Sequence, residues 1–146
     1  MRRLVIVIGA MLVLLPGCGK PPMIPVTGTV TLAGKPLPFC KVNFFPDVAE
    51  FDPLTQGYGY GITDADGKFQ IRHPGGEMGI YPGTYRVTFV AWVDNKGNPI
   101  PFDAKPSEVK GGVKNLLPGT YESLEDTPER ATVTRSRLDQ TFNLVK

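Results

Sequence analysis

A chain of 146 residues has the length of one domain, and its 16 basic against 14 acidic side chains leave too small a basic surplus to indicate binding to nucleic acid. Arg2 and Arg3 account for the whole formal net charge of +2, so the rest of the chain is formally neutral. A lone histidine and two cysteines distant in sequence do not make a metal-ligand set, and we expect neither a metal nor a cofactor.

The first 17 residues have the organisation of an export signal. Arg2 and Arg3 form a positive start, and an uncharged apolar run of 12 residues follows, from Leu4 to Leu15. A membrane-spanning helix needs about 20 apolar residues, so this run is too short to span a bilayer and suits the hydrophobic part of a signal peptide. The alternative is an uncleaved or buried N-terminal helix, which the order of charge, apolar run and small residue disfavours.

The end of that run, Leu15 to Cys18, resembles a lipobox, where a lipoprotein signal peptidase cuts before a cysteine that carries diacylglycerol. Gly17 is small enough to enter the protease, and Cys18 supplies the thiol. The resemblance implies a signal peptide over residues 1–17, cleavage between Gly17 and Cys18, and an exported protein held at a membrane by lipid on Cys18. Because Gly19 is not the inner-membrane retention residue Asp, it also implies the outer membrane or the periplasmic face.

The chain after Cys18 divides into a short tether and one domain. Residues 18–25 are rich in proline and predict an extended tether. Over residues 26–146 apolar and polar residues alternate with period two, and no helical periodicity is sustained. The predicted strands are 26–33, 39–45, 57–63, 68–72, 84–93, 131–134 and 141–145, with turns at 34–36 and 64–67 and irregular structure between 94 and 130. About seven strands with frequent turn signals predict a β-sandwich or barrel.

Three segments resemble the carboxypeptidase regulatory-like domains. Residues 26–46 resemble their first two strands and the Gly-Lys-Pro-Leu turn between them. GITDADGKFQI at 61–71 resembles their Thr-Asp-x-x-Gly-x-Phe hairpin, and YPGTYRVTF at 81–89 resembles their Pro-Gly-x-Tyr-x-Val strand. The resemblance implies an all-antiparallel, Greek-key β-sandwich of the transthyretin type. It implies little about function.

Several residues of these segments have roles in folding that elementary chemistry predicts. Asp64 is expected to accept backbone N–H groups in an Asx-turn, Gly67 to take a positive φ, and Tyr85 to place its ring in the core and its hydroxyl at a corner. A calcium loop around Asp64 and Asp66 is the alternative. It is disfavoured because Lys68 and its neighbours stand where further acidic ligands are needed.

No catalytic set is recognisable, and we expect the protein not to be an enzyme. His73 stands beside Pro74 and is predicted to be a loop residue, and no Gly-x-Ser-x-Gly elbow or Ser/His/Asp order occurs. Transthyretin-like hydrolases use several histidines and a C-terminal Tyr-Arg-Gly-Ser, which this chain lacks. Cys40 shares a predicted strand face with Val42 and Phe44, which indicates a buried, inert thiol rather than a reactive one.

Aromatic residues supply the remaining candidate site. Tyr58, Tyr60 and Trp92, together with Phe51, can form a platform on which sugars stack, although packing in the core or at an edge is the usual role of such rings. Two functions therefore stay open. One is a lipid-anchored, non-catalytic module with a structural or protein-interaction role in the envelope, and the other is a carbohydrate-binding module of the cell surface. A third, an envelope enzyme, requires the carboxylates and His73 to converge in one cleft.

The lipobox makes a direct prediction. We expect Cys18→Ala to abolish labelling by a fatty-acid analogue and to leave an uncleaved precursor, because the variant lacks the thiol that receives diacylglycerol. Labelling is measured on the immunoprecipitated protein, with precursor and mature forms resolved by gel electrophoresis. Labelling of the variant equal to that of the wild type would refute the anchor.

Overall fold

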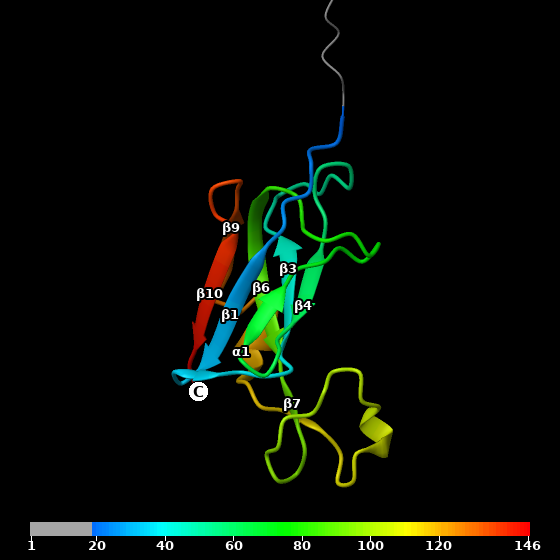
Figure 1. The fold of residues 1–146 in the computed structure, drawn as a ribbon, viewed down its shortest axis with the longest axis vertical. Helices are drawn as coiled ribbons and strands as arrows, with labels where there is room; N and C mark the ends of the chain where they lie inside the picture. Colours follow the sequence, from blue (N-terminus) through cyan, green and yellow to red (C-terminus); the bar gives the residue numbers. More distant parts are fainter. Residues whose placement is uncertain (1–18) are drawn as a thin grey trace, which may run out of the picture.

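The computed structural model describes residues 19–146, which form a β-sandwich of two layers (Figure 1). One sheet has the order β10 (Asp139–Leu144), β1 (Thr27–Leu32) and β2 (Lys35–Pro36), and β5 (Lys68–Gln70) also pairs with β1. The other has the order β4 (Gly59–Ile62), β3 (Lys41–Pro46), β6 (Gly83–Val90) and β9 (Arg130–Val133). A two-stranded ribbon of β7 (Trp92–Val93) and β8 (Lys114–Asn115) lies beyond one end of the sandwich (Figure 1).

The predicted all-β sandwich is confirmed, with one exception to its antiparallel pairing. β1 and β10 are parallel, from Thr27 beside Asp139 to Leu32 beside Leu144. Both strands begin at the end of the sandwich where the N-terminal tether enters. The first and last strands therefore run in the same direction (Figure 1). The Greek-key order of connections stays a prediction.

The two predicted turns have different outcomes. At 34–36 the prediction was wrong, because Lys35 and Pro36 form β2 and the turn is Ala33-Gly34. Both turn residues have positive φ, 50° and 78°, the left-handed geometry that suits a two-residue hairpin. At 64–67 the turn is confirmed: the Asp64 carboxylate accepts the backbone N–H groups of Asp66 and Lys68, each at 2.9 Å, and Gly67 has φ 74°.

The hairpin around this second turn joins the two layers. β4 pairs with β3 in one sheet, whereas β5 pairs with β1 in the other. The two arms remain in contact through backbone hydrogen bonds between Tyr60 and Arg72, at 2.9 and 3.0 Å. The hairpin therefore carries the chain from one sheet to the other, and residues 70–72 pass close to β4.

The segment predicted as irregular, 94–130, contains short elements. A 3-10 helix, η1, spans Pro106–Glu108, and α1 spans Gly119–Glu122 and packs against β6. The buried Tyr121 ring of α1 meets Phe89 edge-on, with 6.2 Å between centroids. Elements of this length show no measurable periodicity, which is why the sequence did not predict them. Within residues 19–146, no helix is long and apolar enough to cross a membrane.

The core consists of the inward side chains of both sheets, with Phe44 of β3 at its centre. Its ring centroid lies 6.3 Å from that of Phe69, 5.8 Å from Tyr85 and 6.1 Å from Phe142, so rings from both layers meet there. The Tyr85 hydroxyl donates to the Tyr81 carbonyl at 2.6 Å, as the predicted corner requires. The fully buried valines are Val26, Val30, Val42, Val87, Val93 and Val133.

β1 depends on a glycine. A Cβ at Gly28 would overlap the backbone oxygen of Gln140 on β10 and lie 2.5 Å from Cζ of Phe69. We expect Gly28→Ala to lower the free energy of unfolding by about 1–3 kcal/mol, because the extra carbon forces β10 or the Phe69 ring to move.

Urea denaturation measures this loss. Gly119→Ala is the matched control, since no atom lies within 4 Å of a Cβ at that position. Equal stability of the two variants would show that β1 and β10 are not in the contact described.

Candidate functional site

The outer face of the β4-β3-β6-β9 sheet carries the candidate site, and β4 determines which side chains it shows. Along 57–61 glycine and tyrosine alternate. A Cβ at Gly59 would lie 2.7 Å from Ile71 Cγ2 and from Ile80 Cδ1, and one at Gly61 would lie 2.7 Å from the Gln70 carbonyl oxygen. Only glycine allows residues 70–80 to lie this close to the inner face, so Tyr58 and Tyr60 occupy the outer face.

Three aromatic rings form a continuous row on this face, which we call the tyrosine row. Its members are Phe45, Tyr58 and Tyr60, and all three side chains are partly exposed. The centroids of Phe45 and Tyr58 are 4.9 Å apart, and those of Tyr58 and Tyr60 are 6.0 Å apart with 18° between the planes. The two tyrosine rings are therefore nearly parallel and lie together at the start of β4.

Asn43 holds Tyr58 in place. The Tyr58 hydroxyl donates to Asn43 Oδ1 at 2.5 Å, and Asn43 Nδ2 donates to Thr88 Oγ1 at 3.2 Å. Asn43 is on the outer face, as its strand pattern predicts, but only 8% of its surface is exposed. Loss of water around Tyr58 raises its pKa, and the nearby Tyr60 raises it further, so the phenol remains a neutral donor. The ring is thus fixed before any ligand arrives.

Lys41 connects the tyrosine row to a second pair of rings. Its Nζ lies 5.3 Å from the Tyr60 centroid and 5.1 Å from the Phe102 centroid, within the range of a cation–π contact. Phe102 in turn stacks on Trp92, with 4.3 Å between centroids and 16° between planes. Trp92 therefore has one ring face covered and holds the loop against the sheet. Of the three rings of the predicted platform, Tyr58 and Tyr60 lie together, whereas Lys41 and Phe102 lie between them and Trp92.

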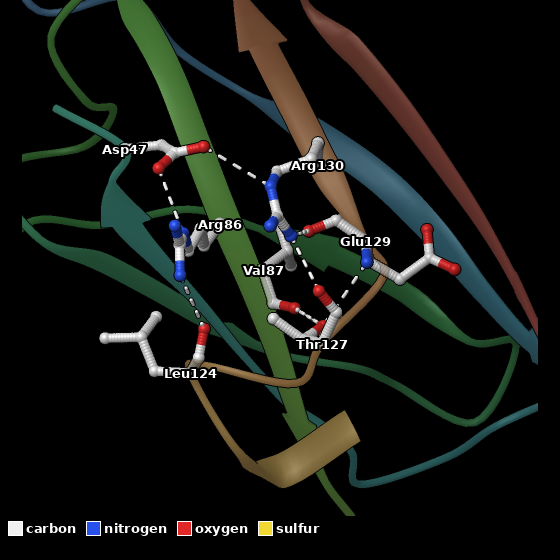
Figure 2. Close-up of polar contacts among 7 residues, drawn as sticks. All are labelled: Asp47, Arg86, Val87, Leu124, Thr127, Glu129 and Arg130. Carbon is white, nitrogen blue, oxygen red and sulfur yellow. Dashed lines mark hydrogen bonds and ion pairs between the residues drawn. The ribbon is translucent and has the colours of Figure 1, made fainter. Parts of the chain in front are cut away.

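The other side of the same face is polar. Figure 2 shows Asp47, which follows β3, between Arg86 of β6 and Arg130 of β9. Arg86 Nε donates to Asp47 Oδ1 at 2.9 Å, and Arg130 Nε lies 3.3 Å from Oδ2. One carboxylate is thus shared by two guanidinium groups across three strands. Because all three side chains are about one-third exposed, we assign the ion pairs a modest contribution to stability.

The same arginines fasten the segment between α1 and β9. Arg86 Nη1 donates to the Leu124 carbonyl at 3.3 Å, and Arg130 Nη1 donates to the Thr127 carbonyl at 2.7 Å (Figure 2). The Thr127 hydroxyl donates to the Val87 carbonyl at 2.6 Å. Burial raises the pKa of Glu129, beside this network. We call the set of Asp47, Arg86 and Arg130 the arginine clamp. These hydrogen bonds and ion pairs bind its side chains to one another and to the segment after α1.

The titratable residues singled out in the sequence do not form one cleft. His73 lies in the loop before β6, where its Nδ1 accepts the Gly75 N–H at 3.3 Å and lies 3.6 Å from a Glu77 oxygen. The turn containing Asp64 and Asp66 lies at the opposite end of the sandwich (Figure 1). In the described part of the chain, no three His, Cys, Asp or Glu residues gather to hold a metal ion.

The two cysteines differ in what the structure says of them. Cys40 is fully buried, as predicted, and burial raises the pKa of its thiol to about 12. At neutral pH it is therefore protonated and unreactive. Cys18 and the preceding Gly17 lie outside the described residues.

No protein-family model and no curated protein matches this chain. Two solved structures show a distant similarity to it. The first is a 9R-lipoxygenase from Cyanothece, with 16% sequence identity and a TM-score of 0.39. The matched region covers 85% of this chain and 16% of the lipoxygenase. The second is a "putative carbohydrate binding protein" from Pseudomonas aeruginosa, with 18% identity and a TM-score of 0.40. The matched region covers 85% of this chain and 88% of the Pseudomonas protein. At these scores neither structure assigns a ligand to this chain.

The buried thiol predicts a specific dependence on pH. The unfolded chain loses the Cys40 proton near its ordinary pKa of 9.0, whereas the folded chain keeps it until about 12. Between these values the unfolded state binds fewer protons, so the free energy of unfolding falls as pH rises, by up to about 1.4 kcal/mol per pH unit from this group.

Urea denaturation from about pH 8 to about pH 10.5 measures that slope. Cys40→Ala is the comparison, because every other group titrates alike in the two proteins. A shallower slope is expected for Cys40→Ala, and identical slopes would contradict the burial of a protonated thiol.

Proposed function

We propose that this protein is a non-catalytic binding module of the cell envelope, held at a membrane by lipid on Cys18, and that it binds a glycan chain along the tyrosine row. The observation that carries the proposal is the pair of nearly parallel rings of Tyr58 and Tyr60 on an open sheet face. The lipobox supports the location, since an exported and anchored domain faces the polysaccharides of the envelope.

The chemistry of the row suits a sugar. A pyranose ring has a face of C–H groups, which carry small positive charge and pack against the negative face of an aromatic ring. Two rings with centroids 6.0 Å apart offer more apolar surface than one, which suits a chain rather than a single sugar. Because Asn43 fixes Tyr58, little conformational freedom is lost when a ligand binds.

Polar groups beside the row can recognise hydroxyl or carboxylate groups. A shallow hollow of about 380 Å³ adjoins Tyr60, and its lining includes Gln70 and the exposed Arg72. Lys41 lies on the other side, over the Tyr60 ring. In ligand sites generally, apolar contact gives affinity and a few placed polar groups give orientation.

Two further roles remain to be compared with glycan binding. A protein partner would use the same exposed tyrosines, which are common in protein interfaces. An enzyme would need converging acid and base groups, whereas His73 and Asp64 lie at opposite ends of the sandwich. The separation of His73 from Asp64 supports the non-catalytic proposal.

Removal of one ring tests the site. We expect Tyr60→Ala to weaken binding to polysaccharide by at least about tenfold, equivalent to about 1.4 kcal/mol, because one stacking platform is lost. Binding is measured by electrophoresis in native gels that contain neutral or uronate-bearing cell-wall polysaccharides, in which a binding protein is retarded.

Phe51→Ala is the matched control, because that ring is 60% exposed but lies on the loop after β3 and not in the row. A Tyr60→Ala variant that is retarded as strongly as the wild type would contradict a site on the tyrosine row. A Phe51→Ala variant that loses as much retardation as Tyr60→Ala would also contradict it. A wild-type protein that no polysaccharide retards would overturn glycan binding and leave the protein-interaction role.

A further inference from the structure

Exposed apolar side chains gather at the end of the sandwich where the tether enters. Among the described residues, eight large apolar side chains are exposed, and five of them belong to three loops at this end (Figure 1). Phe51 and Leu54 are the most exposed of the five, at 60% and 58%. The five are Val48, Phe51 and Leu54 after β3, Met78 before β6, and Leu138 before β10.

The tether keeps this end close to the proposed anchor. Ile24 is buried and pairs with Ile80 through two backbone hydrogen bonds, of 2.8 and 3.0 Å, so the chain is fixed to the domain from that residue on. An extended residue spans at most about 3.6 Å, so the six steps from Ile24 back to Cys18 reach about 22 Å at most. A lipid on Cys18 therefore limits how far this end can move from the bilayer.

The most apolar of the three loops lies directly beside the tether. Gly19 and Lys20 line one hollow together with Asp52, Leu54 and Thr55. The loop has its own internal order, since the Asp52 carboxylate accepts the Leu54 N–H and the Thr55 hydroxyl, both at 2.9 Å. Phe51 and Leu54 are thus held outward in a turn that lies next to the residue following Cys18.

We infer that this end of the domain is a second membrane contact, in which Phe51, Leu54 and Val48 enter the interfacial layer of the bilayer that holds the lipid on Cys18. The inference rests on the proposed anchor. A loop that carries exposed apolar residues and is held against a lipid headgroup region buries them there without further folding. The strands of both sheets run away from this end, so the contact leaves the faces of the sheets clear of the bilayer (Figure 1).

A fluorescent probe in the loop tests the contact. Ala49→Cys places a thiol between Val48 and Phe51, and the buried Cys40 does not compete for the label. The lipidated mature protein is extracted from membranes, labelled with nitrobenzoxadiazole, and reconstituted in vesicles of phosphatidylethanolamine and phosphatidylglycerol. We expect a blue-shifted emission that brominated lipid quenches. Ala65→Cys, in the exposed turn at the opposite end, is the matched control and is expected to show neither effect.

The outcomes separate the contact from the anchor. Vesicle-bound protein whose Ala49 probe emits as in water overturns the contact and leaves the anchor intact. A wild-type protein absent from the membrane fraction overturns both. A blue shift without quenching by brominated lipid indicates that the probe is buried against protein. That result overturns the proposed contact with the bilayer. Replacing Phe51 and Leu54 by serine is expected to remove the quenching, and quenching that persists overturns the assigned residues.

Discussion

The close approach of residues 70–80 to the inner face of β4 determines both the fold and the candidate site. At Gly59 and Gly61 a Cβ would lie 2.7 Å from atoms of that segment, so a side chain at either position would force the segment to move. The same approach allows the chain to leave one sheet at β4 and enter the other at β5. Since successive residues of a strand face opposite ways, the tyrosines between the glycines must face outward.

The outer face of this sheet is a rigid platform with two different sides. Near β4 it presents the tyrosine row, in which Asn43 and Thr88 fix Tyr58 from below. Near β9 the arginine clamp holds β3, β6 and β9 together and fastens the segment after α1. A binding surface on strands positions its side chains more exactly than one on loops, so the row needs no rearrangement to receive a ligand.

Alternation of residues predicted most of the strands, because each has one face in the core. It also predicted the buried Cys40, and local chemistry predicted the Asp64 turn and the Tyr85 corner. The features that the sequence did not predict depend on contacts between residues distant in sequence. The parallel pairing of β1 with β10, the contact of Lys41 with Phe102 and the arginine clamp join residues far apart in sequence. The sequence also named Tyr58 and Tyr60 without showing which face they take, because the fit of glycine against residues 70–80 decides it.

Tyrosine resonances give the most direct test of the account. The chain has five tyrosines, of which Tyr81, Tyr85 and Tyr121 are buried and Tyr58 and Tyr60 are partly exposed on the outer face. In a protein with ¹³C-labelled tyrosine rings, titration with soluble cell-wall oligosaccharides is predicted to shift the ring signals of Tyr58 and Tyr60 and to leave the other three in place. Signals that all stay unchanged, or shifts confined to the buried tyrosines, would contradict a glycan site on the tyrosine row.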